Sequence, residues 1–354
     1  MKKLSIALCV LLAILTACGC GNVLPGEQGS TGALTQSLTT DAAASADTEE
    51  PSTAAGASEQ VSVQPAEQTV RQTGQQSEQP PEGNGGLYAG KIKPSVLPDA
   101  KDSVGFYVYF VDVGQADCAV VICDGTVMLV DGGNTADSSR VVAVLKKLGA
   151  EAVDTVICTH AHEDHCGGLA GALNVFNVSQ VFAPVQGADT KAYKNFIKGV
   201  QKQKLEVQNP VAGLKLYIGS ALVIFHSPTR IEFEDLNNTS LVFTVEYGGI
   251  KVLFTGDAEK ELEAAMLDEG APLEADLLKV GHHGSETSSS YRFLRQVNPR
   301  AAVISVGEGN SYGHPADDTL SRFRDAEVQV LRTDENGDVL ATVQDGALKI
   351  YTQK

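Results

Sequence analysis

Thr159-His160-Ala161-His162-Glu163-Asp164-His165-Cys166-Gly167-Gly168 is a histidine-rich segment that directly follows the apolar run Val156-Ile157-Cys158. The whole chain has only seven histidines, so three of them within one hexapeptide indicate a metal site rather than an exposed polar loop. Imidazole nitrogen and carboxylate oxygen are ligands that zinc-like cations prefer. His160 and His162 lie two positions apart, and Asp164 and His165 are adjacent. Such pairs can be divided between two metals only if a turn, not a regular helix, presents them. The segment therefore predicts a metal site built on a turn.

Four further apolar segments each end in a residue type that binds metals. Residues 127–130 lead to Asp131, 223–225 to His226, 252–254 to Asp257, and 277–280 to His282 and His283. Each of these polar residues lies beside or near Gly or Pro. Together with the histidine-rich segment, the four strand ends predict a dinuclear metal site.

The remaining pattern predicts an α/β domain. Short runs rich in Val, Ile, Phe and Tyr end in Gly, Asp or Asn, which is typical of strands. We expect strands at 106–111, 119–122, 127–130, 155–158, 180–183, 222–225, 240–245, 251–254, 302–306 and 329–332. Helical periodicity predicts helices at 138–148, 191–203 and 259–268. Hairpins with interspersed helices favour two sheets packed face to face with helices outside.

The expected helix at 191–203 has a basic face formed by Lys191, Lys194, Lys198 and Lys202. Such a face is usually only solvated. We nevertheless take Lys194 and Lys198 as candidate substrate-binding residues for a phosphate-rich substrate. Residues 101–354 carry 34 acidic and 22 basic side chains, a net charge of −12. An acidic surface does not attract polyanions by its overall field, which argues mildly against a dedicated nucleic-acid binder, although a local basic surface could reverse this.

The front of the chain predicts export. Residues 1–17 combine two lysines, an apolar core and small terminal residues, as a secretory signal peptide does. Leu15-Thr16-Ala17-Cys18 resembles a bacterial lipobox, which implies lipidation of Cys18; an ordinary signal peptide is the alternative. Residues 18–100, rich in small and polar types, are expected to form a disordered tether. We thus expect one large folded domain at 101–354, lipid-anchored on the extracellular face of the cell membrane.

Cysteine spacing leaves the redox state of the domain open. The spacing of the four cysteines of the domain matches no disulfide-rich scaffold; they are Cys118, Cys123, Cys158 and Cys166. Buried thiols, a disulfide and oxidation-sensitive neighbours of the metals all remain compatible with the sequence.

Motifs along the domain resemble those of the metallo-β-lactamase superfamily, in the expected order from residue 104 to about 350. Within it, the chain is similar to the hydrolase domain of ComEC-type competence proteins. The segments that carry this resemblance are Phe110-Val111-Asp112-Val113-Gly114-Gln115, Asn237-Asn238-Thr239-Ser240-Leu241-Val242, Thr255-Gly256-Asp257-Ala258-Glu259, Leu278-Lys279-Val280-Gly281-His282-His283-Gly284-Ser285 and Tyr312-Gly313-His314-Pro315. Ala116 replaces the usual glycine of the Asp-Val-Gly-Gln-Gly-Asp pattern.

The resemblance implies an αβ/βα four-layer sandwich with two divalent metals, Zn or Mn, at a strand edge. It implies that His160, His162 and His226 hold one metal. Asp164, His165 and one histidine of the 282/283 pair hold the other, and Asp257 bridges both. His282 is favoured over His283 only weakly. Asp131, Asn238 and Ser240 are expected to orient ligands, and Asp112 and Asp117 to have a structural or supporting role. His314 is a candidate donor to the leaving group or the substrate phosphate, or a loop histidine bonded to backbone.

The expected activity is that of a surface-anchored phosphodiesterase whose substrate is a phosphodiester, DNA among the candidates. An alternative is a cell-envelope phosphoester hydrolase resembling the choline-phosphate esterase of teichoic acid. β-Lactam hydrolysis ranks third, and an inactive metal-dependent binding protein is the alternative outside enzymes. Nothing in the sequence resembles the membrane channel of competence proteins, so we expect hydrolysis rather than DNA transport. The only expected membrane contact is the lipid anchor, and the sequence leaves the oligomeric state open.

Overall fold

The computed structural model describes residues 87–354. The expected signal peptide at 1–17, the lipidation site Cys18 and most of the expected tether lie outside the described residues. Within residues 87–354, none of the helices has the length and apolar character needed to cross a membrane.

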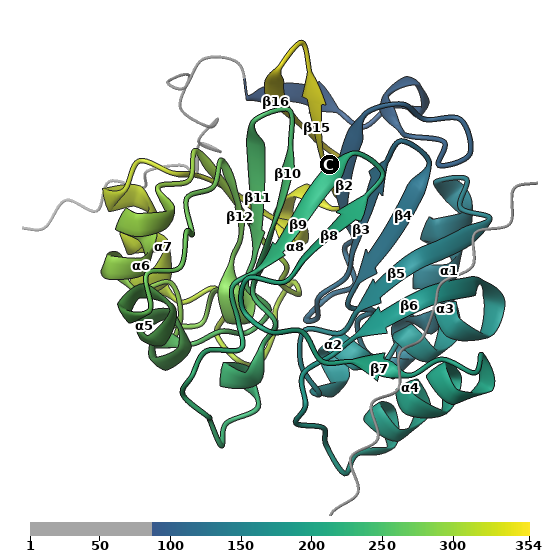
Figure 1. The fold of residues 1–354 in the computed structure, drawn as a ribbon. Helices are drawn as coiled ribbons and strands as arrows, with labels where there is room; N and C mark the ends of the chain where they lie inside the picture. The colour runs from purple at the N-terminus through teal and green to yellow at the C-terminus, as the bar shows by residue number, and fades with distance from the viewer. Residues whose placement is uncertain (1–86) are drawn as a thin grey trace, which may run out of the picture. The chain divides into compact units, whose positions relative to one another are not determined.

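The described residues form two sheets flanked by helices (Figure 1). The first sheet has nine strands in the order β1-β16-β15-β2-β3-β4-β5-β6-β7 and the second has seven, in the order β14-β13-β12-β11-β10-β9-β8. The strands of the first sheet are β1 (Tyr88–Lys91), β2 (Phe106–Phe110), β3 (Ala119–Cys123), β4 (Thr126–Val130), β5 (Ala152–Ile157), β6 (Asn177–Phe182), β7 (Val207–Gln208), β15 (Val339–Gln344) and β16 (Ala347–Thr352). Those of the second are β8 (Lys215–Ile218), β9 (Ala221–Phe225), β10 (Phe243–Tyr247), β11 (Ile250–Phe254), β12 (Leu277–Lys279), β13 (Ala301–Ile304) and β14 (Gln329–Arg332).

Eight α-helices join these strands. They are α1 (Ser138–Lys147), α2 (Glu163–Cys166), α3 (Leu169–Val175), α4 (Lys191–Lys202), α5 (Lys260–Asp268), α6 (Tyr291–Val297), α7 (Asp317–Asp325) and α8 (Thr333–Asn336) in the described part of the chain. Short 3₁₀ turns occur at Pro94–Val96, Thr135–Asp137, Asn237–Thr239 and Gly281–Gly284.

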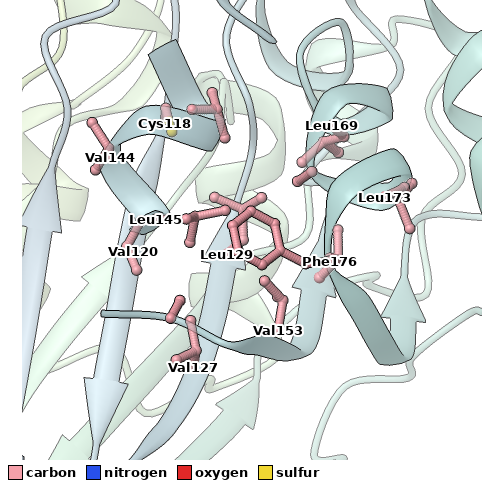
Figure 2. Close-up of a cluster of buried hydrophobic side chains, with 14 of the residues drawn as sticks. Cys118, Val120, Val127, Leu129, Val144, Leu145, Val153, Leu169, Leu173 and Phe176 are labelled. Carbon is pink, nitrogen blue, oxygen red and sulfur yellow. The ribbon is translucent and has the colours of Figure 1, made fainter. Parts of the chain in front are cut away.

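Three apolar layers hold the elements together. Side chains from both sheets, among them Phe110, Phe225 and Phe254, form the layer between the sheets. A second layer joins the first sheet to α1, α3 and α4; Figure 2 shows Leu129 of β4 in this cluster with Leu145 of α1 and Leu173 of α3. A third layer joins the second sheet to α5, α6 and α7. The fold is therefore the expected αβ/βα four-layer sandwich. Strands such as β3 are buried along their whole length because both of their faces are covered.

The expected boundary between tether and domain at residue 100 is wrong. Leu87 is buried, β1 pairs in parallel with β16, and the backbone N–H of Ile92 donates to the carbonyl of Thr352 at 2.8 Å. Ala100 is also buried, and its N–H donates to the carbonyl of Leu148. A strand of four residues that contains Gly90 in a left-handed conformation shows no periodicity in the sequence, so only its pairing partner reveals it.

Candidate metal centre

The candidate site lies where strands of both sheets end. β4 runs parallel to β5, and β11 runs parallel to β12, so the carboxyl ends within each pair meet at one edge. Asp131 follows β4, the histidine-rich segment follows β5, Asp257 follows β11, and the histidine pair follows β12. The structure thus brings together residues that lie more than 150 positions apart in the sequence.

A tight turn presents the histidine-rich segment. His162 has an extended backbone and precedes the four-residue helix α2, which carries Asp164 and His165. This helix packs against the loop after β4 so closely that a Cβ atom on Gly168 would collide with the carbonyl of Gly132. The glycines at the end of the segment therefore fix the position of the two ligands on α2 relative to Asp131.

Four side chains form one compact group of potential ligands. The ligand atoms of Asp164, His165, Asp257 and His283 all lie within 4.8 Å of one another. His165 Nε2 is 3.2 Å from Asp257 Oδ1, and His283 Nε2 is 3.2 Å from Asp164 Oδ2. Two ligands bound tetrahedrally at 2.0–2.1 Å from a metal lie about 3.3 Å apart. The closest spacings within this set of four ligands match that separation. We call the set the second group, because a first group lies on the other side of Asp257.

Three further histidines, His160, His162 and His282, form a first group beside the other carboxylate oxygen of Asp257. His160 Nε2 lies 3.8 Å from Asp257 Oδ2 and 3.1 Å from His162 Nδ1. His282 Nε2 lies 3.9 Å from the same oxygen. Asp257, which is 2% exposed, thus lies between the two groups. Both histidines of the 282/283 pair face it, although the sequence weakly favoured His282 alone.

The ring tautomers show that a cation fits the second group. His165 Nδ1 is 2.9 Å from Asp131 Oδ2, so its proton points to that carboxylate. His283 Nδ1 donates to the carbonyl of Ser305 at 2.9 Å. In their neutral forms both rings would therefore direct Nε2 lone pairs at carboxylate oxygens, and within residues 87–354 His165 Nε2 and Asp257 Oδ1 have no hydrogen-bond partner. A divalent cation satisfies all of these atoms, so the cluster points to divalent metal ions.

The electrostatics of the cluster agree with this fit. Burial disfavours the charged form of His283, yet Asp257, Asp117 and Asp164 together raise its pKa to about 10. Burial likewise opposes ionisation of Asp257, but His165 and His283 hold the pKa of that carboxyl well below its usual range. The buried carboxylates therefore require positive charge nearby, which metal ions supply in place of protons.

Supporting side chains fix the ligands from behind. Ser240 accepts from the N–H of Asp257 at 3.0 Å and lies 3.5 Å from His160 Nδ1. Asn238 accepts from the N–H groups of Glu259 and Leu262, which holds the turn after Asp257. Ser240 and Asn238 thus orient the loop that carries the bridging carboxylate.

Three residues that the sequence did not single out complete this support. Glu259 Oε1 is 3.1 Å from His282 Nδ1 and accepts from Thr287 Oγ1. Buried Lys279 contacts Asp117 at 2.7 Å, and Asp117 Oδ1 lies 3.3 Å from His283 Nδ1. Thr159 donates to Asp131 through both its N–H and its hydroxyl. A charged lysine inside the apolar run 277–280 was the signal in the sequence that could have indicated this network.

The structure does not bring His226 to the cluster, so we remove it from the expected ligand set. His226 Nε2 lies 3.0 Å from Thr244 Oγ1 on β10. Burial, followed by the charge of Lys251, lowers the pKa of His226 to about 4, and Glu274 opposes the shift weakly. Neither Lys251 nor Glu274 belongs to the metal groups, which shows that the ring faces a different environment.

We expect His226 to make the fold acid-sensitive. An unfolded histidine titrates near pKa 6.5. The folded pKa is lower, so the stabilisation is complete above pH 6.5 and declines as the pH falls towards 4. Between pH 7.5 and pH 5.0 this residue should account for about 2 kcal/mol of lost stability at 1.4 kcal/mol per pH unit. Urea unfolding of metal-free wild type and His226→Gln should differ by that amount in their pH dependence; equal losses would contradict this environment.

The expected substrate-binding lysines lie on α4, which packs against α2 and α3. Lys194 forms an ion pair with Asp189, and Lys202 Nζ donates to Asn174. In the described part of the chain, Lys198 is exposed and forms no ion pair. Of the two candidate lysines, Lys198 is therefore the one whose charge is free for another partner.

His314 lies at the rim of the metal centre, with its ring edge-on to that of His282 at 5.6 Å between centroids. Gln115 Oε1 accepts from the N–H of Gly307, which directs the Gln115 amide nitrogen at His314 Nδ1, 3.4 Å away. Burial lowers the pKa of His314 below its ordinary value, which favours the neutral ring. With Nδ1 accepting, Nε2 carries the proton. This arrangement favours the expected donor role over a loop histidine bonded to backbone.

All four cysteines of the described residues are buried free thiols. Cys158 Sγ donates to the carbonyl of His160 at 3.0 Å, and Cys166 Sγ lies 3.7 Å from the carbonyl of Ala161. Burial raises the pKa of Cys158 well above its ordinary value and that of Cys166 to about 12. Both thiols therefore stay protonated and buttress the histidine-rich turn.

Fold and site together define a metal-binding αβ/βα sandwich. The family profile described as Metallo-beta-lactamase superfamily matches residues 111–308. The chain belongs to the metallo-beta-lactamase superfamily, whose members are usually metal-dependent hydrolases.

Individual relatives refine this assignment. The chain is 30% identical to ComE operon protein 3 of Bacillus subtilis (strain 168) over 250 residues, which cover 66% of this chain and 32% of that protein. It is 29% identical to Competence protein ComA of Neisseria gonorrhoeae over 255 residues, covering 71% and 34%. The chain thus spans about a third of the length of these relatives. Among solved structures, the metallo-beta-lactamase fold protein YhfI from Bacillus subtilis aligns with a TM-score of 0.45 and 14% identity, covering 64% of this chain and 96% of that chain. The expected similarity to competence proteins is confirmed.

Proposed function

We propose that this chain is a phosphodiesterase that uses two divalent metal ions, Zn or Mn. The observation that carries the proposal is the position of Asp257. Its Oδ1 lies 3.2 Å from His165, while its Oδ2 faces His160, His282 and His283 at 3.8 to 3.9 Å. One buried carboxylate between two groups of ligands is the arrangement expected of a dinuclear centre.

The proposed ligand sets follow these distances. His160, His162 and His282 would hold one ion, and Asp164, His165 and His283 the other, with Asp257 shared. When bound, two such ions lower the pKa of water towards 7 and neutralise charge that develops on the phosphate. Asp131 holds His165 in the tautomer that leaves Nε2 free. His314, protonated at Nε2, would donate to the leaving oxygen or to a phosphate oxygen.

The proposed substrate is DNA or another phosphodiester outside the cell. The name of one relative, Competence protein ComA, refers to competence, which supports a nucleic-acid substrate. We further propose that residues 1–17 direct export, that a lipid on Cys18 anchors the chain to the membrane, and that the segment up to residue 86 tethers the hydrolase domain. A cell-envelope choline-phosphate ester remains the competing substrate.

Hydrolysis of bis-p-nitrophenyl phosphate by the Mn- or Zn-loaded chain tests the activity. We expect turnover that is lost on chelation and restored by metal. A chain that contains two metals and still cleaves no phosphodiester would refute the proposal. Turnover of nitrocefin in place of phosphodiesters would instead identify a β-lactamase.

If DNA is the substrate, Lys198→Glu should lower kcat/KM for DNA about three- to tenfold at low salt, since one phosphate contact is lost and repulsion is added. Hydrolysis of the small ester should not change. Lys146→Glu is the matched control, because Lys146 is also exposed, on α1, but lies in the last turn of that helix, away from the strand ends that carry the site. Equal losses in both variants would show that Lys198 has no specific role.

A further inference from the structure

The loop after β13 exposes an aromatic ring beside the metal centre. The side chain of Tyr312 is 72% exposed. It stacks on His314 with 5.8 Å between ring centroids and 27° between ring planes. His314 in turn lies edge-on to His282, whose Nε2 is 3.9 Å from Asp257. The rings of Tyr312, His314 and His282 therefore form a continuous series of contacts from solvent to the ligand groups.

The backbone of this loop is fixed by Asn310. Its amide nitrogen donates to the carbonyls of Gly307 and His314 at 3.0 and 2.6 Å. Its amide oxygen accepts from the N–H groups of Tyr312 and His314, each at 3.1 Å. The exposed ring is thus carried on a loop whose backbone is held by four hydrogen bonds to one side chain, and such preorganisation reduces the entropy lost on binding.

Apart from its stacking on His314, no contact within residues 87–354 explains the exposed ring of Tyr312. Its hydroxyl has no hydrogen-bond partner among residues 87–354. Tyr291 is the contrasting case, because it is 57% exposed but donates its hydroxyl to Asp325 at 2.7 Å. The ring face of Tyr312 that does not stack on His314 is turned to solvent and is suited to stacking on a flat ring of a ligand.

We propose that Tyr312, stacked on His314, is a platform for the nucleobase next to the scissile phosphodiester, so that the substrate is single-stranded nucleic acid. The inference rests on the proposed function. In a duplex the base faces are already stacked, whereas a single strand offers them to a protein ring. A quaternary ammonium group, the competing ligand for an aromatic surface, is recognised by cages of several rings. Here a single tyrosine face meets solvent.

The contribution of base stacking to KM can be measured with three esters that share one leaving group. They are thymidine 5′-p-nitrophenyl phosphate, methyl p-nitrophenyl phosphate and p-nitrophenylphosphocholine. We expect Tyr312→Ala and Tyr312→Leu to raise KM for the thymidine ester about tenfold, as loss of one base stack does. The other two esters should change less than twofold. Tyr312→Phe should behave as wild type, and so should the control Tyr291→Ala.

Two outcomes would overturn the proposed stacking role of Tyr312. One is an unchanged KM for the thymidine ester in Tyr312→Ala, and the other is an equal rise in KM for all three esters. A selective loss on the phosphocholine ester would assign the ring to choline instead. Binding of oligothymidylate and of an abasic oligomer to the full chain provides a readout without turnover. Tyr312→Ala should weaken only the oligothymidylate about tenfold, and equal affinities for wild type and variant would refute the platform. If wild type hydrolyses none of the esters, the proposed function fails while this binding test still decides the platform.

Discussion

Replacing Asp257 by asparagine should reduce hydrolysis of bis-p-nitrophenyl phosphate by about a thousandfold or more. The neutral amide removes the carboxylate that lies between both ligand groups, so the two proposed metal ions would lose their shared charged ligand. Positioning and charge neutralisation by two metals contribute several kcal/mol to such reactions, and each 1.4 kcal/mol corresponds to a tenfold change in rate. Initial rates at saturating metal are the measurement.

Asp268→Asn is the matched control for this variant. Asp268 lies at the end of α5, is largely exposed and forms an ion pair with Arg292, so its replacement should leave the rate unchanged. Circular dichroism should show both variants folded. Activity of Asp257→Asn within tenfold of wild type would contradict a dinuclear mechanism.

Asp131→Asn should weaken binding of metal to the second group about 10- to 100-fold, the usual effect of losing a partner that orients a ligand. Asp131 has a left-handed backbone with φ of 54°, which asparagine also adopts readily. An asparagine whose oxygen still accepts from the N–H of Thr159 turns its amide nitrogen towards His165 Nδ1. His165 Nδ1 must then accept a hydrogen bond from this amide. The ring proton of His165 therefore moves to Nε2, and Nε2 can no longer bind a metal.

Calorimetric titration of the metal-free variant with Zn measures this affinity. Asp124→Asn is the control, since Asp124 also has a left-handed backbone and accepts from the N–H of Gly105, remote from the metal groups. We expect wild-type affinity in the control. Wild-type affinity in Asp131→Asn would show that the carboxylate does not set the tautomer of His165.

Much of the site could be predicted because its residues follow strand ends. Apolar runs such as 127–130 and 252–254 end in Asp131 and near Asp257, and parallel pairing brings such ends together. The histidine-rich segment could be recognised by its spacing alone. The helices at 138–148 and 191–203 were predicted to within a residue at their ends, because each carries a regular apolar stripe.

The rest depends on tertiary contacts that leave no local signal. Both His226 and Asp257 come at or soon after the end of an apolar strand, yet only Asp257 faces the ligand groups, because the loop after β9 turns His226 towards Thr244. His282 and His283 have consecutive left-handed backbones, which lets both rings face Asp257; a regular strand would send them to opposite sides. β1 is recognisable only through its pairing with β16.

We propose above all that two metal ions share Asp257 in an active enzyme. Elemental analysis of the chain during stepwise metal loading, with phosphodiesterase activity measured on each sample, tests this most directly. We predict that activity reaches its plateau at about two metal ions per chain, the number expected of a dinuclear centre, and that Asp257→Asn binds fewer. Full activity with a single ion per chain, or in metal-free protein, would show that hydrolysis does not need two metal ions that share Asp257.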